Sequence, residues 1–297
     1  MNSAAVIEVA PQFNEMIEQL SHAGHIAIDT ESNSFYAYHE RICLIQISTP
    51  ARDYVLDPLA LKDLGPLGEV LAEPRIEKIF HAASNDILGL KRDFCFKVEN
   101  LFDTAIACKL LGYKQLGLAR VLEQHFGVLL NKKWQRYDWG KRPLRQEQID
   151  YASLDTHYLI SLRHTLAFDL LSNNLWDTAK EAFDKASEQE LQARSFHPEA
   201  FLQLRGAQSL DPTGKRVLKA LYVYREREAR RRDRAPFRVL SNETLVRVAH
   251  LRPQSVRDFL KIKGMPRSYQ EGRGAYTLLG VIRKAMDENS KTAKYSA

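Results

Sequence analysis

The sequence predicts two domains of different class: an α/β domain with a mixed sheet flanked by helices, followed by a small all-α domain. Strand signals occur only before residue 103, with helical signals around them, and only helical signals follow residue 212. Residues 191–212 have mixed composition, two prolines and no clear period, which is typical of a linker. We therefore expect domains over residues 1–190 and 213–290, joined by a linker over 191–212.

Each strand of the first domain is predicted from a short apolar run bounded by turn residues. These runs cover residues 26–31, 41–48, 53–57, 76–81 and 100–102. Short connections between the first three favour antiparallel neighbours. Helical spacing covers residues 11–22, 64–72, 105–111, 116–126 and 145–173, and the last range leaves room for a break. Ser84 is expected to cap the helix after the fourth strand, and Asp103 the helix over 105–111.

The second domain is predicted as four helices and carries most of the positive charge. Its helical ranges are 213–232, 242–251, 255–262 and 273–288. The chain has a net charge of +6, but residues 205–297 hold 22 Lys and Arg against 9 Asp and Glu. A basic second half joined to an acidic first half suggests a catalytic domain followed by a domain that binds nucleic acid. The alternative is a helical domain with a solvated basic face.

Composition is that of a soluble globular protein, with 44% hydrophobic and 27% charged residues. No apolar run approaches the length of a membrane span, and the first residues lack a basic-then-apolar signal pattern. The three cysteines, Cys43, Cys95 and Cys108, form no CxxC pair. They are typical of reduced core cysteines, so we expect a cytoplasmic protein without a disulfide framework.

Asp29 and Glu31 are the first candidate catalytic residues. They lie two apart in the run IAIDTES, so on a strand they share one face. Adjacent carboxylates repel each other unless a cation lies between them, and oxygen-only ligands suit magnesium or manganese. The alternative is a strand that ends at the surface with solvated acids.

Three further side chains extend this acidic set. Asp86 lies in the first turn of the helix after the fourth strand, where the helix dipole favours an acid whatever its function. Tyr151 and Asp155 lie four apart and therefore on one helix face. The alternative for this pair is an aromatic anchor in the core beside a surface acid.

The joint order of these residues resembles the tyrosine-bearing branch of the DEDD exonuclease superfamily. Longer stretches of the sequence are also similar to ribonuclease D, namely IAIDTES, LIQIS, DPL, FHAASNDILGL, FDT, RPL and QIDYASLDTHYL. The stretch ALYVYREREARRRDRAPFRVLSNETLVRVA resembles the HRDC domain shared by RecQ-type helicases and ribonuclease D. The resemblance covers residues 20–290 and implies a ribonuclease-H-like fold for the first domain.

The resemblance also implies roles for single residues and two divalent metal ions, Mg²⁺ or Mn²⁺. Asp29 would contact both metals, Glu31 and Asp155 would complete one site, and Asp86 would hold the second metal. Tyr151 would orient the attacking water; an ordinary phenol pKa near 10 is too high for an efficient base at neutral pH. Phosphodiester hydrolysis suits such a site, because two metals about 3.5–4 Å apart can activate water and stabilise the leaving oxygen.

Cations and aromatic residues suggest where nucleic acid binds. The loop over residues 131–145 and the end of the helix over 213–232 mix the two kinds, which suits phosphate pairing and base stacking. Tyr137 stands where the family has a small residue, so recognition of the RNA end can differ here. The alternative is that the loop aromatics only pack the loop down and the arginines form a solvated face. The expected contacts are Lys133, Arg136, Trp139, Arg142, Arg230, Arg231 and Arg234.

The sequence is therefore interpreted as a 3′-5′ exoribonuclease of ribonuclease D type. It would release 5′-mononucleotides from tRNA precursors or other structured RNA, with RNA as its partner and no membrane. The alternatives are a Werner-type DNA exonuclease, with the same acidic set, and a non-catalytic RNA-binding protein on a decayed nuclease fold.

Overall fold

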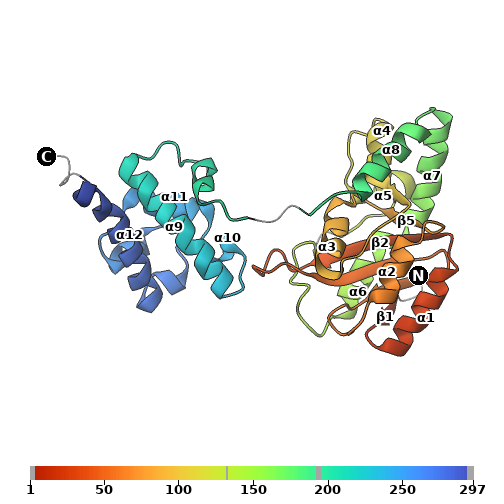
Figure 1. Cartoon of the computed structure of the whole chain (residues 1–297), viewed down its shortest axis with the longest axis horizontal. Helices are drawn as coiled ribbons and strands as arrows, with labels where there is room; N and C mark the ends of the chain where they lie inside the picture. Colours follow the sequence, from red (N-terminus) through yellow and green to blue (C-terminus); the bar gives the residue numbers. More distant parts are fainter. Residues whose placement is uncertain (1–3, 132, 192–194, 293–297) are drawn as a thin grey trace. The chain divides into compact units, whose positions relative to one another are not determined.

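The computed structural model describes residues 4–131, 133–191 and 195–292, and forms two compact units (Figure 1). The first unit is built on a six-stranded sheet in the order β1-β4-β3-β2-β5-β6. The strands are β1 (Ala5–Ile7), β2 (His25–Ser32), β3 (Ile42–Ser48), β4 (Asp53–Leu56), β5 (Glu77–Phe80) and β6 (Leu101–Asp103). β2, β3 and β4 pair antiparallel, as predicted, while β1, β5 and β6 pair parallel with their neighbours.

Eight helices of the described residues surround this sheet. They are α1 (Ala10–Ser21), α2 (Gly65–Ala72), α3 (Ser84–Phe94), α4 (Thr104–Leu110), α5 (Leu118–Phe126), α6 (Gln146–His157), α7 (Leu159–Ser172) and α8 (Trp176–Ser187). Every residue of β3 is buried, since apolar side chains cover both faces of the central strands. Leu44 and Val55 pack with Ile149 and Ala152 of α6, whereas Ile28 and Ile47 belong to the main core with α1.

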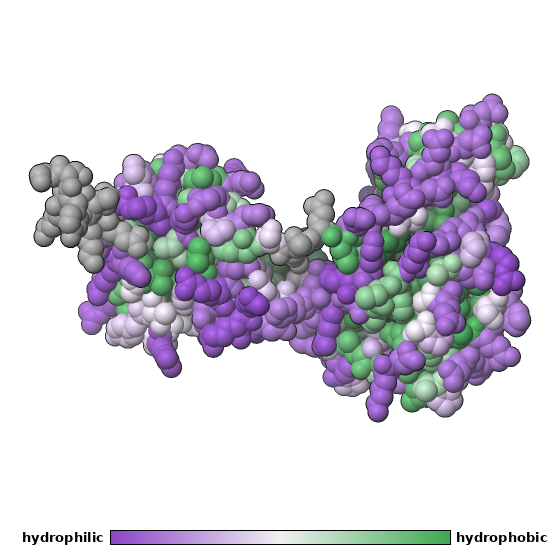
Figure 2. Space-filling view, viewed as in Figure 1, coloured by the Kyte–Doolittle hydropathy of each residue, from purple (hydrophilic) through white to green (hydrophobic). Residues whose placement is uncertain are grey.

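The second unit is all helical, which confirms the predicted class. Its elements are η1 (Pro198–Gln203), α9 (Pro212–Arg231), α10 (Pro236–Val239), α11 (Asn242–Leu251), η2 (Val256–Lys261), η3 (Arg267–Tyr269) and α12 (Gly272–Thr292). A separate apolar core forms between α9, α11 and α12, with Leu221, Val248 and Ile282 fully buried. Hydrophilic residues cover much of the visible face of this unit (Figure 2).

Residues 34–40, which we call the inserted segment, belong to the second unit although they follow β2 directly in sequence. The carboxylate of Asp233 accepts the backbone N–H groups of Tyr38 at 3.1 Å and His39 at 2.9 Å. The Tyr38 hydroxyl donates to Glu226 at 2.6 Å, and the Ala235 N–H donates to the Tyr36 carbonyl at 2.9 Å. The chain therefore passes between the units after residue 33, after residue 40 and after residue 192. The boundaries predicted from sequence contained only the last of these passages.

Several local predictions are confirmed. The long range over 145–173 breaks at Tyr158, between α6 and α7. Asp103 caps α4 by accepting the N–H groups of Ala105 and Ile106. The helix predicted over 116–126 is α5, and the glycine that follows it, Gly127, ends it with a φ of +66°, as glycine after a helix commonly does. Within residues 4–131, 133–191 and 195–292, no helix has both the length and the apolar content to cross a bilayer.

Other local predictions are wrong. Ser84 does not cap α3; it is the first helical residue, and Ala83 is the N-cap. A different side chain contacts this end of the helix: the carboxylate of Asp103 accepts the backbone N–H of Ala83 at 2.8 Å. Residues 255–262 form the 3₁₀ helix η2 instead of an α-helix. Apolar periodicity also missed β1, α8, η1 and α10, of which β1 and α10 are too short to show a period.

Candidate active site

Strand β2 places two carboxylates on one face of the sheet. Asp29 pairs with Gln46 and Glu31 with Leu44 on the antiparallel β3, so these four side chains share a face. Ser48, also on this face, forms a hydroxyl-hydroxyl hydrogen bond of 2.7 Å with Thr156 of α6. The face that carries Asp29 and Glu31 is therefore the face that α6 covers.

Asp86 is fixed to the same strand from α3. Its carboxylate accepts the backbone N–H of Thr30 at 3.1 Å and the Thr30 hydroxyl at 2.6 Å. β5 pairs with β2 only at residues 25–27, so beyond that point the edge of β2 is open to α3. Asp86 is 8% exposed, and this anchorage brings the third acid beside Asp29 and Glu31.

Helix α6 brings Tyr151 and Asp155 to the site, and two contacts fix its register on the sheet. Besides the Thr156 contact, a ring nitrogen of His157 lies 2.7 Å from the Asp53 carboxylate, which also accepts the Ser48 hydroxyl at 2.7 Å. Both anchor residues follow Asp155 directly in sequence. They therefore hold the end of α6 that carries this carboxylate.

The electrostatics show that the four acids form one group. Burial raises the pKa of Asp29 well above its usual range, and the carboxylates of Asp86, Asp155 and Glu31 raise it further. Burial, with Asp155 and Asp86, raises the pKa of Glu31 to about 9. Burial raises the pKa of Asp155 to about 7 and that of Asp86 to about 6, against the Thr30 hydrogen bonds. Ionised together, these groups destabilise the site unless a positive charge joins them.

The donor set fits divalent metal ions. It consists of carboxylate oxygens alone, the ligands that Mg²⁺ and Mn²⁺ prefer. Among the described residues, no Lys, Arg or His forms an ion pair with any of the four acids. No three His, Cys, Asp or Glu side chains of those residues already form a metal cage. Metal binding would thus include drawing the carboxylates together against a repulsion that the ions relieve.

Tyr151 is held by an aromatic row from the loop before α6. The Trp139 ring stacks on the Tyr151 ring with centroids 6.2 Å apart and 23° between planes. Tyr137 makes edge contacts with both Trp139 and Trp134, so all three loop aromatics support one another. Burial, with Asp155, Glu31 and Asp29, raises the pKa of the Tyr151 phenol. A neutral hydroxyl at this place can donate a hydrogen bond.

Two residues expected to bind nucleic acid are structural instead. Trp139 is 1% exposed, so its ring cannot stack on a base; it packs under Tyr151. The Arg142 guanidinium bonds Asp57 and donates to the backbone carbonyls of Trp139 at 2.7 Å and Cys43 at 2.8 Å. The sequence showed cations and aromatics in a loop, but not which of them fold inward.

The other expected contacts lie at the surface. Lys133 and Arg136 are exposed in the loop before α6. The Lys133 ammonium lies 4.6 Å from the centroid of the Trp134 ring and 3.5 Å from the Glu147 carboxylate. Arg230, Arg231 and Arg234 are exposed on the second unit. Their contact with nucleic acid stays a prediction.

Sequence reasoning missed Gln46. This side chain is fully buried opposite Asp29, and neither its amide nitrogen nor its amide oxygen has a hydrogen-bond partner among the described residues. Buried amides are ordinarily paired, so an orphaned one beside a candidate catalytic acid marks a polar site. The signal in the sequence was a polar residue inside an otherwise apolar strand.

Comparison with known proteins identifies the families of both units. Residues 5–170 match the 3′-5′ exonuclease family, and residues 214–282 match the HRDC domain. The catalytic core of RRP6 from Trypanosoma brucei has a TM-score of 0.87 at 27% identity, covering 96% of this chain and 80% of that chain. Escherichia coli RNase D, an exoribonuclease involved in structured RNA processing, has a TM-score of 0.70 at 28% identity, covering 96% and 75%.

A curated relative extends the comparison to longer proteins. The "Exosome complex component 10 homolog" of Caenorhabditis elegans is 33% identical over 256 residues, which are 84% of this chain and 29% of that protein. The chain spans about a third of the length of most curated relatives it matches. The predicted cytoplasmic location is wrong: the relatives are exosome components, which in eukaryotes are nuclear or nucleolar, and reduced cysteines do not distinguish the two compartments.

Proposed function

The chain belongs to the 3′-5′ exonuclease family and carries an HRDC domain, and we propose that it hydrolyses RNA from the 3′ end to 5′-mononucleotides. The observation that carries the proposal is the group of four carboxylates beside Tyr151, one buried and three half-buried, whose pKa values all rise, chiefly through desolvation. The similarity to E. coli RNase D, described as acting in structured RNA processing, supports RNA as the substrate.

In this proposal the four acids hold two divalent ions. The carboxylates of Asp86, Asp155 and Glu31 all raise the pKa of Asp29, which suits a carboxylate that contacts both ions. Glu31 and Asp155 would complete one position, and Asp86, fixed by Thr30, the other. Once bound, the ions would lower the pKa of a water molecule and stabilise the charge on the leaving oxygen.

Tyr151 would orient the attacking water. Its phenol pKa is raised, so the hydroxyl stays protonated at neutral pH and donates or accepts a hydrogen bond without carrying charge. Trp139 limits the ring to one position, and the Ser48 and Asp53 contacts hold α6 in register. Orientation of this kind lowers the entropy cost of attack.

Substrates with a paired stem and a single-stranded 3′ tail, as in tRNA precursors, suit a chain that joins an exonuclease unit to a basic helical unit. The test is digestion of 5′-labelled RNA and a matched DNA with Mg²⁺, Mn²⁺ or EDTA. We expect a ladder that shortens from the 3′ end on RNA, 5′-mononucleotide products and no reaction in EDTA. Equal or faster digestion of the DNA, or undiminished digestion in EDTA, would contradict the proposal.

A further inference from the structure

Two exposed phenylalanines that are about two hundred residues apart in sequence lie side by side on the second unit. Phe35 of the inserted segment is 43% exposed and Phe237 of α10 is 49% exposed. Their rings meet edge to face with centroids 6.3 Å apart. Exposed aromatic rings cost free energy in water, so a pair of them, assembled from distant segments, suggests a binding surface.

Arg238 contacts the aromatic residues of both segments. Its guanidinium carbon lies 3.7 Å from the centroid of the Tyr36 ring and 6.0 Å from that of the Phe237 ring. Its Nε also donates to the Phe35 carbonyl, and the Tyr36 carbonyl accepts the Ala235 N–H. We call Phe35, Tyr36, Phe237 and Arg238 the stacking platform. Because one backbone bond and one side chain-to-backbone bond tie the two segments together, we expect ligand binding to cost little ordering of the platform.

The charge around the platform favours a polyanion. Three acids lie within residues 225–238, and each is already engaged in the unit. Glu226 accepts the Tyr38 hydroxyl, Glu228 pairs with Arg231 and Arg232, and Asp233 accepts two backbone N–H groups. Arg225 is buried and bonds Leu240 and Asn242, so it does not contribute to this surface. The exposed cations are Arg227, Arg230, Arg231 and Arg234.

We propose that the stacking platform binds single-stranded RNA, with bases stacked on Phe35 and Phe237 and phosphates on the neighbouring arginines. Aromatic faces beside cations are the features by which proteins bind single strands without reading their sequence. Only three residues separate Glu31 from Phe35, so the covalent chain keeps their Cα atoms within about 14 Å. The platform would therefore bind nucleotides close to the 3′ end. This inference rests on the proposed function, since it names where that substrate binds.

The test measures binding to full-length protein carrying Asp155→Asn, so that the RNA is not degraded. Fluorescence anisotropy with a 5′-labelled single-stranded RNA compares Phe35→Ala and Phe237→Ala with the parent. We expect about tenfold weaker binding for each, because one stacked base is lost. The matched control is Tyr276→Ala, since Tyr276 is 69% exposed on α12 of the same unit and should leave affinity unchanged.

Two further measurements distinguish the loss of base stacking from a change in charge contacts and from misfolding of the variants. An RNA of the same length without bases should bind the parent and the Phe→Ala variants equally. Phe237→Trp should restore affinity, and thermal unfolding should show that each variant is folded. Equal affinity of the phenylalanine variants and the parent would overturn the proposal, and would leave a protein as the occupant of this surface. Equal losses on base-free RNA would overturn it as well. Wild-type protein that fails to degrade RNA would instead contradict the proposed function.

Discussion

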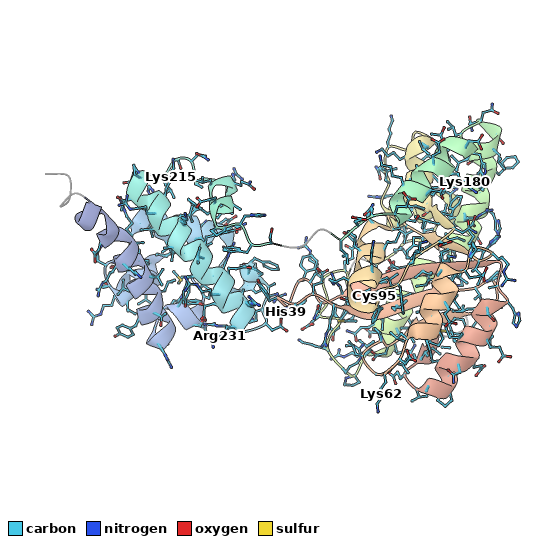
Figure 3. All side chains as sticks on the ribbon, in the orientation of Figure 1. His39, Lys62, Cys95, Lys180, Lys215 and Arg231 are labelled. Atoms are coloured by element: carbon cyan, nitrogen blue, oxygen red, sulfur yellow. The ribbon has the colours of Figure 1, made fainter. Side chains whose placement is uncertain are left out.

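The candidate active site of the first unit and the arginine-rich end of α9 in the second differ in where they place their charged side chains. Asp29, Glu31, Asp86 and Asp155 are gathered under α6 without a cation, and burial and repulsion raise their pKa values. At the surface of residues 225–238 the acids instead bond within the unit, as Asp233 does with the His39 N–H, and arginines such as Arg231, labelled in Figure 3, are exposed. The first arrangement costs stability and suits the proposed metal-dependent chemistry, while the second costs little and suits reversible binding.

The largest expected effect is that of removing one buried acid. Asp155→Asn should reduce turnover by about 10³-fold or more, because metal binding and water activation depend on the carboxylate. The same change should raise the melting temperature of the metal-free protein, since it removes one of the repelling charges. Single-turnover digestion of labelled RNA and calorimetry measure both effects. The control is Glu18→Gln on α1, an exposed acid that should change neither. If the metal-free variant is less stable than the parent, repulsion between the four acids does not destabilise the site.

Tyr151→Phe should have a smaller effect, of about 10- to 100-fold on turnover, with RNA affinity near that of the wild type. The hydroxyl is lost from a site where it acts mainly in the transition state, while the ring still stacks on Trp139. The pH-rate profile should keep its shape. Disappearance of a basic limb in the variant would show that the phenol ionises during the reaction.

The metal-free protein should lose stability as pH rises. A carboxyl whose folded-state pKa is raised binds its proton more tightly when folded, so its contribution is fully present near pH 4 and is lost above the folded pKa. With Asp86 at about 6, Asp155 at about 7 and Glu31 at about 9, the loss should extend from roughly pH 5 to pH 9. Denaturant unfolding across this range measures it. Adding Mg²⁺ should flatten the slope, and a slope that Mg²⁺ leaves unchanged would exclude these acids as its cause.

The smallest effect is expected on the second unit. Arg230→Gln and Arg234→Gln should each weaken RNA binding modestly and reduce the slope of log K against log salt by about 0.7–0.9. Melting temperature should stay within error, because neither side chain forms an ion pair with another residue that the structure describes. Arg225→Gln is the contrast: this buried guanidinium bonds Leu240 and Asn242, so the change should destabilise the unit. An unchanged salt slope would make the exposed arginines a solvated face.

The inserted segment changes how the halves can be separated. A fragment of residues 1–190 would contain all five candidate catalytic residues, as the sequence indicated. It would lack Asp233, Glu226 and Arg238, which bind residues 34–40 in the full chain. Phe35 and Tyr38 would then follow β2 without their contacts. Function of the two units is therefore better separated by point substitutions in the full chain.

The sequence by itself determined the fold class, most element positions and the membership of the acidic set. Periodicity and capping are local, so short spacings suffice to predict β2, the helical content of residues 145–173 and the Asp103 cap, although the structure was needed to place the break at Tyr158. The spacings Asp29–Glu31 and Tyr151–Asp155 likewise fix which side chains share a face, whatever the rest of the chain does.

Only the tertiary structure decided which side chains turn inward and which segments meet. Trp139 and Arg142 looked like ligand contacts in a polar loop, yet one packs on Tyr151 and the other bonds Asp57. Segment 34–40 had no role predicted from the sequence, because its partners lie nearly two hundred residues away and no local pattern encodes such pairing. Burial depends on what covers a residue, and the covering group comes from anywhere in the chain. For that reason Phe35 and Phe237 became neighbours only in the folded protein.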